Sequence, residues 1–117
     1  MKFYNGETNI VCSNLENSLK FYKDILGFEF IEEDGEAVRL KLCNQYYLLL
    51  PVAQQRIERN KYCEFPEVSL DLMVDNILEA EKYFKNLNVE FVKTLKDGEK
   101  WFIISDPDGL VLEVIQK

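Results

Sequence analysis

The chain has 117 residues, of which 47% are hydrophobic, and this is the size of a single domain that can bury its own core. Fourteen basic and 21 acidic residues give a net charge of −7, which argues against a protein that binds nucleic-acid phosphates. The absence of histidine excludes serine–histidine triads, cysteine–histidine pairs and histidine-based zinc or iron sites. Three cysteines without a paired spacing, no apolar run of membrane-spanning length and no signal-peptide pattern predict a cytoplasmic protein with reduced thiols.

The first half of the sequence predicts a strand, a helix and three further strands. Ser13 and Glu16 form a capping-box pattern at the start of the helix, and Gly27 supplies the positive φ that ends it. Apolar residues at helical spacing predict one buried stripe, formed by Leu15, Leu19, Tyr22 and Leu26. The predicted strands are 3–12, 28–33, 37–43 and 46–50.

The second half predicts the same order of elements. Asp75 or Asn76 caps a helix with one apolar face, formed by Ile77, Ala80, Phe84 and Leu87. The predicted strands are 68–74, 89–94, 100–105 and 110–115. Residues 13–31 match residues 75–92 at a spacing of 61 or 62, which predicts one structural unit that occurs twice.

These elements predict an α+β fold made of two tandem βαβββ units that form a cupped mixed sheet. We expect a single domain, 1–117, with a first unit at 1–50, a connector at 51–66 and a second unit at 67–117. The connector is long for a compact domain, so it either crosses between the units or borders a site. Its basic residues are interpreted as a solvated segment or, alternatively, as a lid over an anionic ligand: Arg56, Arg59 and Lys61.

Two motifs add a resemblance to a known family. Residues 11–28 read VCSNLENSLKFYKDILGF, and residues 106–113 read DPDGLVLE, with Leu110 where the family more often has asparagine. They resemble the opening and closing signatures of the vicinal oxygen chelate superfamily. That superfamily includes glyoxalase I, ring-cleaving dioxygenases, fosfomycin-modifying enzymes, epimerases and bleomycin-resistance proteins. The resemblance covers essentially the whole chain and implies the fold, but a fold does not decide among these functions.

The resemblance also implies four metal-ligand positions, on the first and last strands of each unit. In this sequence they are occupied by Glu7, Leu49, Ser69 and Glu113. A leucine donates nothing to a metal and a neutral serine hydroxyl is a weak ligand, so we predict no functional metal and no cofactor. The two carboxylates alone would hold a divalent ion such as Mg²⁺ only loosely.

Strand alternation predicts which side chains line the cupped face instead of a metal. If Glu7, Ser69 and Glu113 point into the cup, every second residue on their strands does the same. The predicted ligand-binding set is Glu7, Asn9, Arg39, Tyr47, Leu49, Ser69, Asp71, Met73, Phe102, Val111 and Glu113. A simpler interpretation is that these polar residues form a water-facing surface. Trp101 is interpreted as helix-side core or as a stacking platform at the mouth of the pocket.

The leading functional hypothesis is a metal-free small-molecule binder that resembles the bleomycin-resistance proteins. Aromatic and apolar walls with several carboxylates favour an amphipathic or cationic ligand. The alternative is a glyoxalase-like lyase or isomerase that uses Glu113 or Glu7 with a weakly held divalent metal. A third possibility is a structural or regulatory protein whose cavity has closed. The resemblance further implies a homodimer, and we expect neither a nucleic-acid partner nor a membrane.

Overall fold

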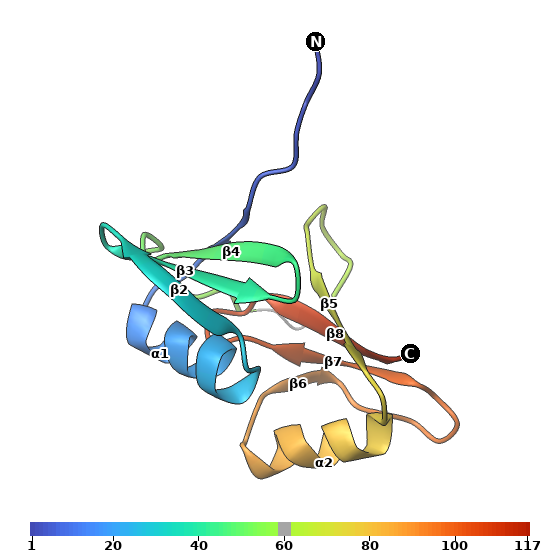
Figure 1. The fold of residues 1–117 in the computed structure, drawn as a ribbon. Coiled ribbons are helices and arrows are strands. Elements are labelled where there is room, and N and C mark those ends of the chain that lie inside the picture. The colour runs from blue at the N-terminus through green and yellow to red at the C-terminus, as the bar shows by residue number, and fades with distance from the viewer. Residues whose placement is uncertain (59–61) are drawn as a thin grey trace. The chain divides into compact units, whose positions relative to one another are not determined.

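The protein is described by a computed structural model that covers residues 1–58 and 62–117 (Figure 1). It consists of two compact units, Met1–Arg56 and Ile57–Lys117. Two of the basic connector residues that were interpreted as a possible lid, Arg59 and Lys61, lie outside the described residues. Among the helices of the described residues, none has the length and apolar character needed to cross a membrane.

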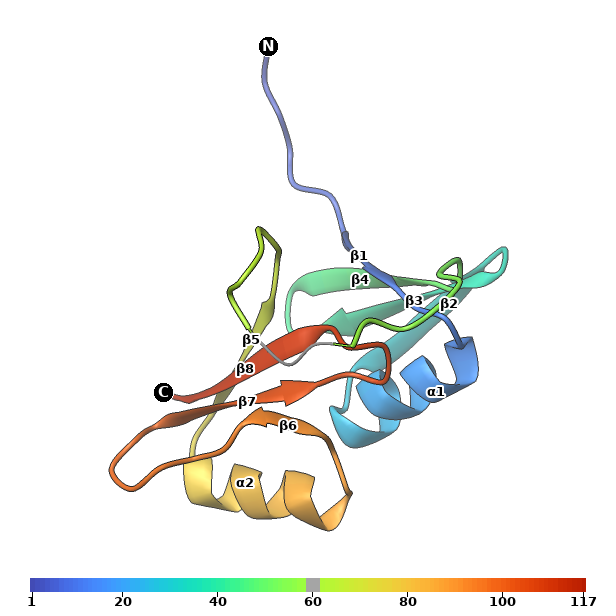
Figure 2. The same ribbon diagram turned by 180° about the vertical axis from the view of Figure 1, so that it is seen from behind.

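The first unit contains one helical segment and a four-stranded mixed sheet. Its strands are β1 (Thr8–Val11), β2 (Glu29–Asp34), β3 (Ala37–Leu42) and β4 (Gln45–Leu50). They lie in the order β1-β4-β3-β2, with β1 parallel to β4 and the other neighbours antiparallel. The helical segment comprises α1 (Leu15–Leu19) and its π-helical continuation η1 (Lys20–Ile25), and Figure 2 shows it against one side of this sheet.

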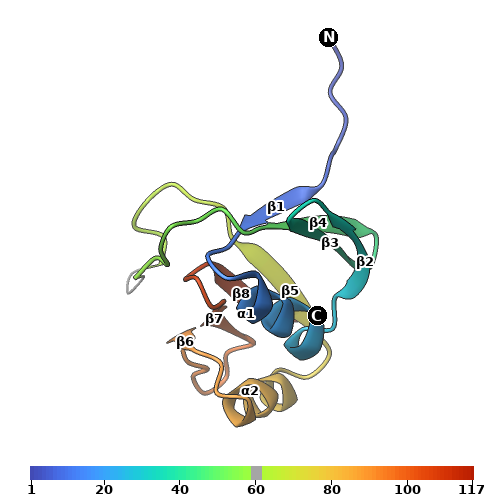
Figure 3. The ribbon, with the colours of Figure 1, turned by 90° about the vertical axis from the view of Figure 1, so that its left-hand side faces the viewer.

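The second unit repeats this arrangement, which confirms the predicted βαβββ order. Its elements are β5 (Leu70–Val74), α2 (Ile77–Asn86), β6 (Phe91–Lys93), β7 (Trp101–Ser105) and β8 (Val111–Gln116). The strand order β5-β8-β7-β6 is the counterpart of the order in the first unit, with β5 parallel to β8. Helix α2 lies against one side of this sheet, near β6 and β7 (Figure 3). The fold is therefore α+β, as the sequence predicts.

The helix starts are capped by asparagine in both units. The Asn14 side chain accepts a hydrogen bond from the Asn17 backbone N–H at 2.9 Å, so the prediction of Ser13 as the cap was wrong by one residue. Asn76 accepts from the backbone N–H groups of Leu78 and Glu79, at 3.0 and 3.1 Å. An amide oxygen in an extended residue reaches these free N–H groups as well as a hydroxyl does.

The first helical segment ends in a π-helical turn, and its buried residues differ from the predicted stripe. The Leu26 N–H donates to the Phe21 carbonyl five residues earlier, which is the π-helical pattern. The buried residues are Ser18, Phe21 and Tyr22, whereas Leu15 and Leu19 of the predicted stripe are only half-buried. Ser18, Phe21 and Tyr22 keep the ordinary helical spacing, so the buried face is rotated relative to the predicted stripe, and Leu15 and Leu19 lie at its edge.

The pairing of β1 with β4 corrects two predicted site residues in the first unit. Thr8 pairs with Tyr47 and Ile10 pairs with Leu49, so both β4 residues lie on the side of the sheet that faces the helix. Leu49 is fully buried, and the Tyr47 ring lies 5.0 Å from that of Phe28. The predicted placement of Tyr47 and Leu49 on the face of Glu7 was therefore wrong. The residue that shares that face is Leu48, the partner of Asn9.

The pairing of β7 with β8 corrects a third residue. Phe102 pairs with Val114, is fully buried, and has its ring 6.0 Å from that of Phe84 on α2. Its predicted place on the face of Glu113 was wrong, because it belongs to the core beneath the helix. Its neighbour Trp101 pairs with Ile115 and lies on the Glu113 face instead.

Candidate functional site

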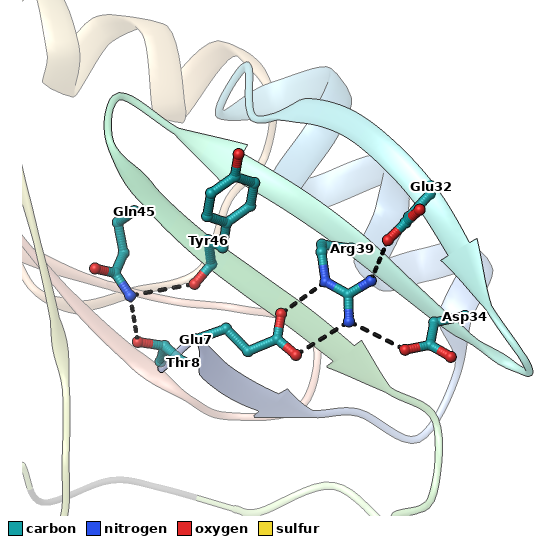
Figure 4. A network of polar contacts seen from close by, with 7 residues as sticks. All are labelled: Glu7, Thr8, Glu32, Asp34, Arg39, Gln45 and Tyr46. Carbon is teal, nitrogen blue, oxygen red and sulfur yellow. Dashed lines mark hydrogen bonds and ion pairs between the residues drawn. The ribbon is translucent and has the colours of Figure 1, made fainter. Parts of the chain in front are cut away.

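The polar face of the first sheet is organised around Arg39 on β3 (Figure 4). The guanidinium binds the Glu7 carboxylate with two hydrogen bonds, Nε to Oε2 at 2.8 Å and Nη2 to Oε1 at 3.1 Å. It also binds Glu32 Oε1 at 2.5 Å and Asp34 Oδ2 at 3.0 Å, both from β2. The sequence correctly placed Arg39 and Glu7 on one face, but it did not single out Glu32 or Asp34.

The Arg39 contacts decide the protonation state of Glu7. The hydrogen bond from Arg39 lowers the pKa of the Glu7 carboxyl below its ordinary value, although partial burial opposes the effect. Glu7 is therefore a paired carboxylate rather than a free base. In this state both of its oxygens already accept hydrogen bonds from one guanidinium.

An open depression of about 740 Å³ lies beside this network. It is lined by residues of the first unit only: Asn5, Gly6, Glu7, Arg39, Asn44, Gln45 and Tyr46. The Gln45 amide donates to the Thr8 hydroxyl at 3.1 Å and to the Tyr46 carbonyl at 3.2 Å, which holds the rim in place (Figure 4). Most of the lining residues are polar and the depression is wide, so it lacks the enclosure of a typical ligand pocket.

The corresponding face of the second sheet consists of two adjacent rows of side chains. One row crosses β7, β8 and β5 through Ile103, Glu113 and Asp71, which are register partners. The next row crosses the same strands through Trp101, Ile115 and Met73. Paired residues point to the same side of a sheet, so an acidic row lies directly beside an apolar, aromatic row.

Residues before β5 complete the acidic row. The Tyr62 hydroxyl lies 3.1 Å from the Ser69 hydroxyl, and it is near enough to Glu113 to affect the pKa of that carboxyl. Burial and a hydrogen bond with Asp71 raise the pKa of Glu113, whereas the Tyr62 hydrogen bond opposes the rise. The sequence alone does not indicate Tyr62, because it lies in the connector, where no periodic pattern marks a residue.

Searches for similar proteins show the fold. No protein-family model matches the sequence, and no curated protein matches it either. Among solved structures, a glyoxalase family protein from Enterococcus faecalis has 26% identity and a TM-score of 0.71, covering 93% of this chain and 94% of that one. A lactoylglutathione lyase from Agrobacterium tumefaciens has 22% identity and a TM-score of 0.68, with coverages of 97% and 92%. A genomically encoded fosfomycin resistance protein from Listeria monocytogenes has 15% identity and a TM-score of 0.74, with coverages of 100% and 95%.

The chain has the vicinal oxygen chelate fold. The resemblance found in the sequence implies four metal-ligand positions, on the first and last strands of the two units. The residues do not fit a metal, because three of the four positions lack an available donor, each for a separate reason. Glu7 is bound by Arg39, Leu48 has no donor atom, and Ser69 offers only a neutral hydroxyl that pairs with Tyr62. Within residues 1–58 and 62–117 there is also no group of three acidic or cysteine side chains that could hold a metal ion.

Within this vicinal oxygen chelate fold, the predicted ligand-binding residues fall into three groups. Glu7 and Arg39 contact each other in the first unit, where Asn9 is exposed on the same face. In the second unit Ser69, Asp71, Met73 and Glu113 share the polar face, and Val111 has the same alternation but is buried. The remaining three belong to the helix-facing sides of the two sheets: Tyr47, Leu49 and Phe102.

Proposed function

We propose that the protein binds an amphipathic organic cation, without a metal ion, on the polar face of the second sheet. The observation that supports this function most directly is the pair of adjacent rows. Asp71 and Glu113 provide negative charge on the same face as an aromatic ring and two apolar side chains. A cation with an aromatic or alkyl portion matches both rows at once, and sequestration of such a molecule requires no chemical step.

The apolar row is accessible to a ligand. Trp101 is 36% exposed and Met73 is 54% exposed, although both are large hydrophobic residues that are usually buried. The Trp101 ring already accepts a cation, because Lys93 Nζ lies 4.2 Å from its centroid. Cation–π contacts of this kind contribute about 0.5–2 kcal/mol each. A methionine beside the ring offers a polarisable surface that adapts to different apolar groups.

A fluorescence titration tests this function. Trp101 is the only tryptophan in the chain, so its emission reports directly on this face. Benzyltriethylammonium, added in the presence of EDTA, is expected to quench Trp101 in a saturable manner, whereas neutral benzyl alcohol is not. Glu113→Gln is expected to weaken binding at least about tenfold, since a contact with a charged group contributes about 1.5–3 kcal/mol.

The matched control is Glu33→Gln, which removes the same charge from an exposed position on β2 of the first unit. It is expected to leave the affinity unchanged. Equal weakening by both variants would show only nonspecific attraction to an acidic protein, and the absence of saturable quenching would contradict the proposed function.

The state of Glu113 favours one second candidate function, which is proton transfer by a carboxyl group. A carboxyl with a raised pKa is what a general acid or base needs near neutral pH. The candidate reaction is a glyoxalase-like isomerisation, tested with the glutathione hemithioacetal of methylglyoxal. Product formation that is lost in Glu113→Gln would favour this function over simple sequestration.

The proposal includes a homodimer, as the resemblance of the sequence implies. Sedimentation equilibrium measures whether two chains associate in solution.

A further inference from the structure

Three carboxylates of the first unit surround one guanidinium (Figure 4). Arg39 contacts Glu7, Glu32 and Asp34 at distances between 2.5 and 3.1 Å, and these acids come from two separate parts of the chain. Only 19% of the Arg39 side chain and 28% of the Glu7 side chain are exposed. The network therefore has a half-buried centre, the Glu7–Arg39 pair, and an exposed outer part formed by β2.

The charge of this network is unbalanced. One guanidinium faces three carboxylates, so the cluster keeps a net charge of −2 even with Arg39 in place. Removing the guanidinium would leave three negative charges around the space it fills. Carboxylate oxygens in that number are a donor set for hard divalent cations such as Mg²⁺, Ca²⁺ and Mn²⁺.

We propose that Arg39 acts as a resident cation, which fills the acidic cradle of the first unit and keeps divalent metal ions out of it. The inference concerns the first unit alone and does not depend on the ligand proposed for the second. The resemblance implies that Glu7 occupies a metal-ligand position, yet the chain lacks the other ligands of a metal site. The inference explains this, because the positive charge beside Glu7 comes from Arg39 itself.

The width of the guanidinium explains why the three acids do not already form a metal group. The guanidinium of Arg39 lies between the carboxylates: Nη1 binds Glu32, and Nη2 binds both Asp34 and Glu7. Glu32 and Asp34 are mostly exposed, with side chains 59% and 60% accessible, so they are free to move inward once the guanidinium is removed. Glu7 is fixed more firmly, because it lies at the half-buried end of the network.

The test is Mn²⁺ binding by Arg39→Met, measured by electron paramagnetic resonance of the free ion. Methionine keeps an apolar stem of similar length and removes the charge and the hydrogen-bond donors. The variant is expected to bind one Mn²⁺ at least about tenfold more tightly than the wild type. Arg39→Lys retains a positive charge in the cradle and is expected to show no such gain.

The matched control is Lys41→Met, which removes one positive charge from the same strand but from outside the network, where Lys41 lies over the Tyr46 ring. If Lys41→Met gains Mn²⁺ affinity to the same extent, the effect is one of net charge and the inference is overturned. It is also overturned if folded Arg39→Met binds Mn²⁺ no better than the wild type. If Arg39→Met does not fold alone, the inference requires that Mn²⁺ restore its thermal transition, and failure to do so is equally contradictory.

Discussion

Replacing Gly109 by alanine tests how the turn before β8 is held. Gly109 has φ +96, and a Cβ at this position would lie 2.2 Å from the Ile57 carbonyl oxygen. The same segment is fixed by a 2.8 Å hydrogen bond from the Ile57 N–H to the Asp108 carbonyl. Alanine therefore adds backbone strain and also displaces Ile57 from the turn.

The expected loss follows from these two effects. A positive φ costs an alanine about 1–2 kcal/mol, and the lost hydrogen bond adds about 1 kcal/mol. The sum of about 2–3 kcal/mol corresponds to a decrease in Tm of about 8–12 °C for a chain of this size. Gly98→Ala is the matched control: Gly98 has φ +80, but a Cβ there meets nothing within 4 Å. We expect it to lose only about 1–2 kcal/mol.

Thermal unfolding followed by circular dichroism compares the two variants under identical conditions. Gly109→Ala is expected to unfold at a clearly lower temperature than Gly98→Ala. Equal decreases in Tm would refute the reasoning, because they would show that backbone strain alone accounts for the loss and that the contact with Ile57 contributes nothing.

Four further outcomes are expected. Ser18→Ala should increase the free energy of unfolding by about 1 kcal/mol, as measured by urea denaturation, because the buried Ser18 hydroxyl has no hydrogen-bond partner among the described residues. Asn76→Ala should lower it by about 1 kcal/mol through loss of the helix cap. Arg39→Met should raise the pKa of Glu7 towards its ordinary value, as measured by carboxyl ¹³C NMR. The pKa of Glu113 is raised in the folded state, so the protonated carboxyl is compatible with the fold and the ionised carboxylate destabilises it. The stability of the wild type therefore falls as pH rises through this pKa. Glu113→Gln should therefore raise Tm relative to the wild type at pH 8, and the gain should shrink towards pH 4.

The helices and strands could be predicted from the sequence because the residues that end them and form the turns are local signals. Gly27, Gly35 and Gly98 all have positive φ where the predicted helix end and turns require it. Asn88 adopts φ 57 at the end of α2, which is the counterpart of Gly27 in the repeat. The π-helical turn was not predictable in this way, because its hydrogen bonds depend on packing rather than on a residue type.

The site was predicted correctly only where a strand alternates between polar and apolar residues. On β5, Asp71 and Met73 are exposed, whereas Leu70, Leu72 and Val74 are partly buried, so the predicted face is correct. Strand β4 (Gln45–Leu50) and strand β7 (Trp101–Ser105) are apolar on both faces, and nothing in such a run fixes which residues point which way. A slip of one residue exchanges the two faces of a strand, and this produced the errors at Tyr47, Leu49 and Phe102.

Chemical-shift mapping tests the central claim most directly. A titration of ¹⁵N-labelled protein with benzyltriethylammonium in EDTA should shift the Trp101 indole N–H and the Met73 amide most strongly, with saturation and without added metal. Shifts centred on Glu7 and Arg39 instead, or binding that requires added Zn²⁺ or Ni²⁺, would contradict metal-free recognition of an organic cation on the second sheet.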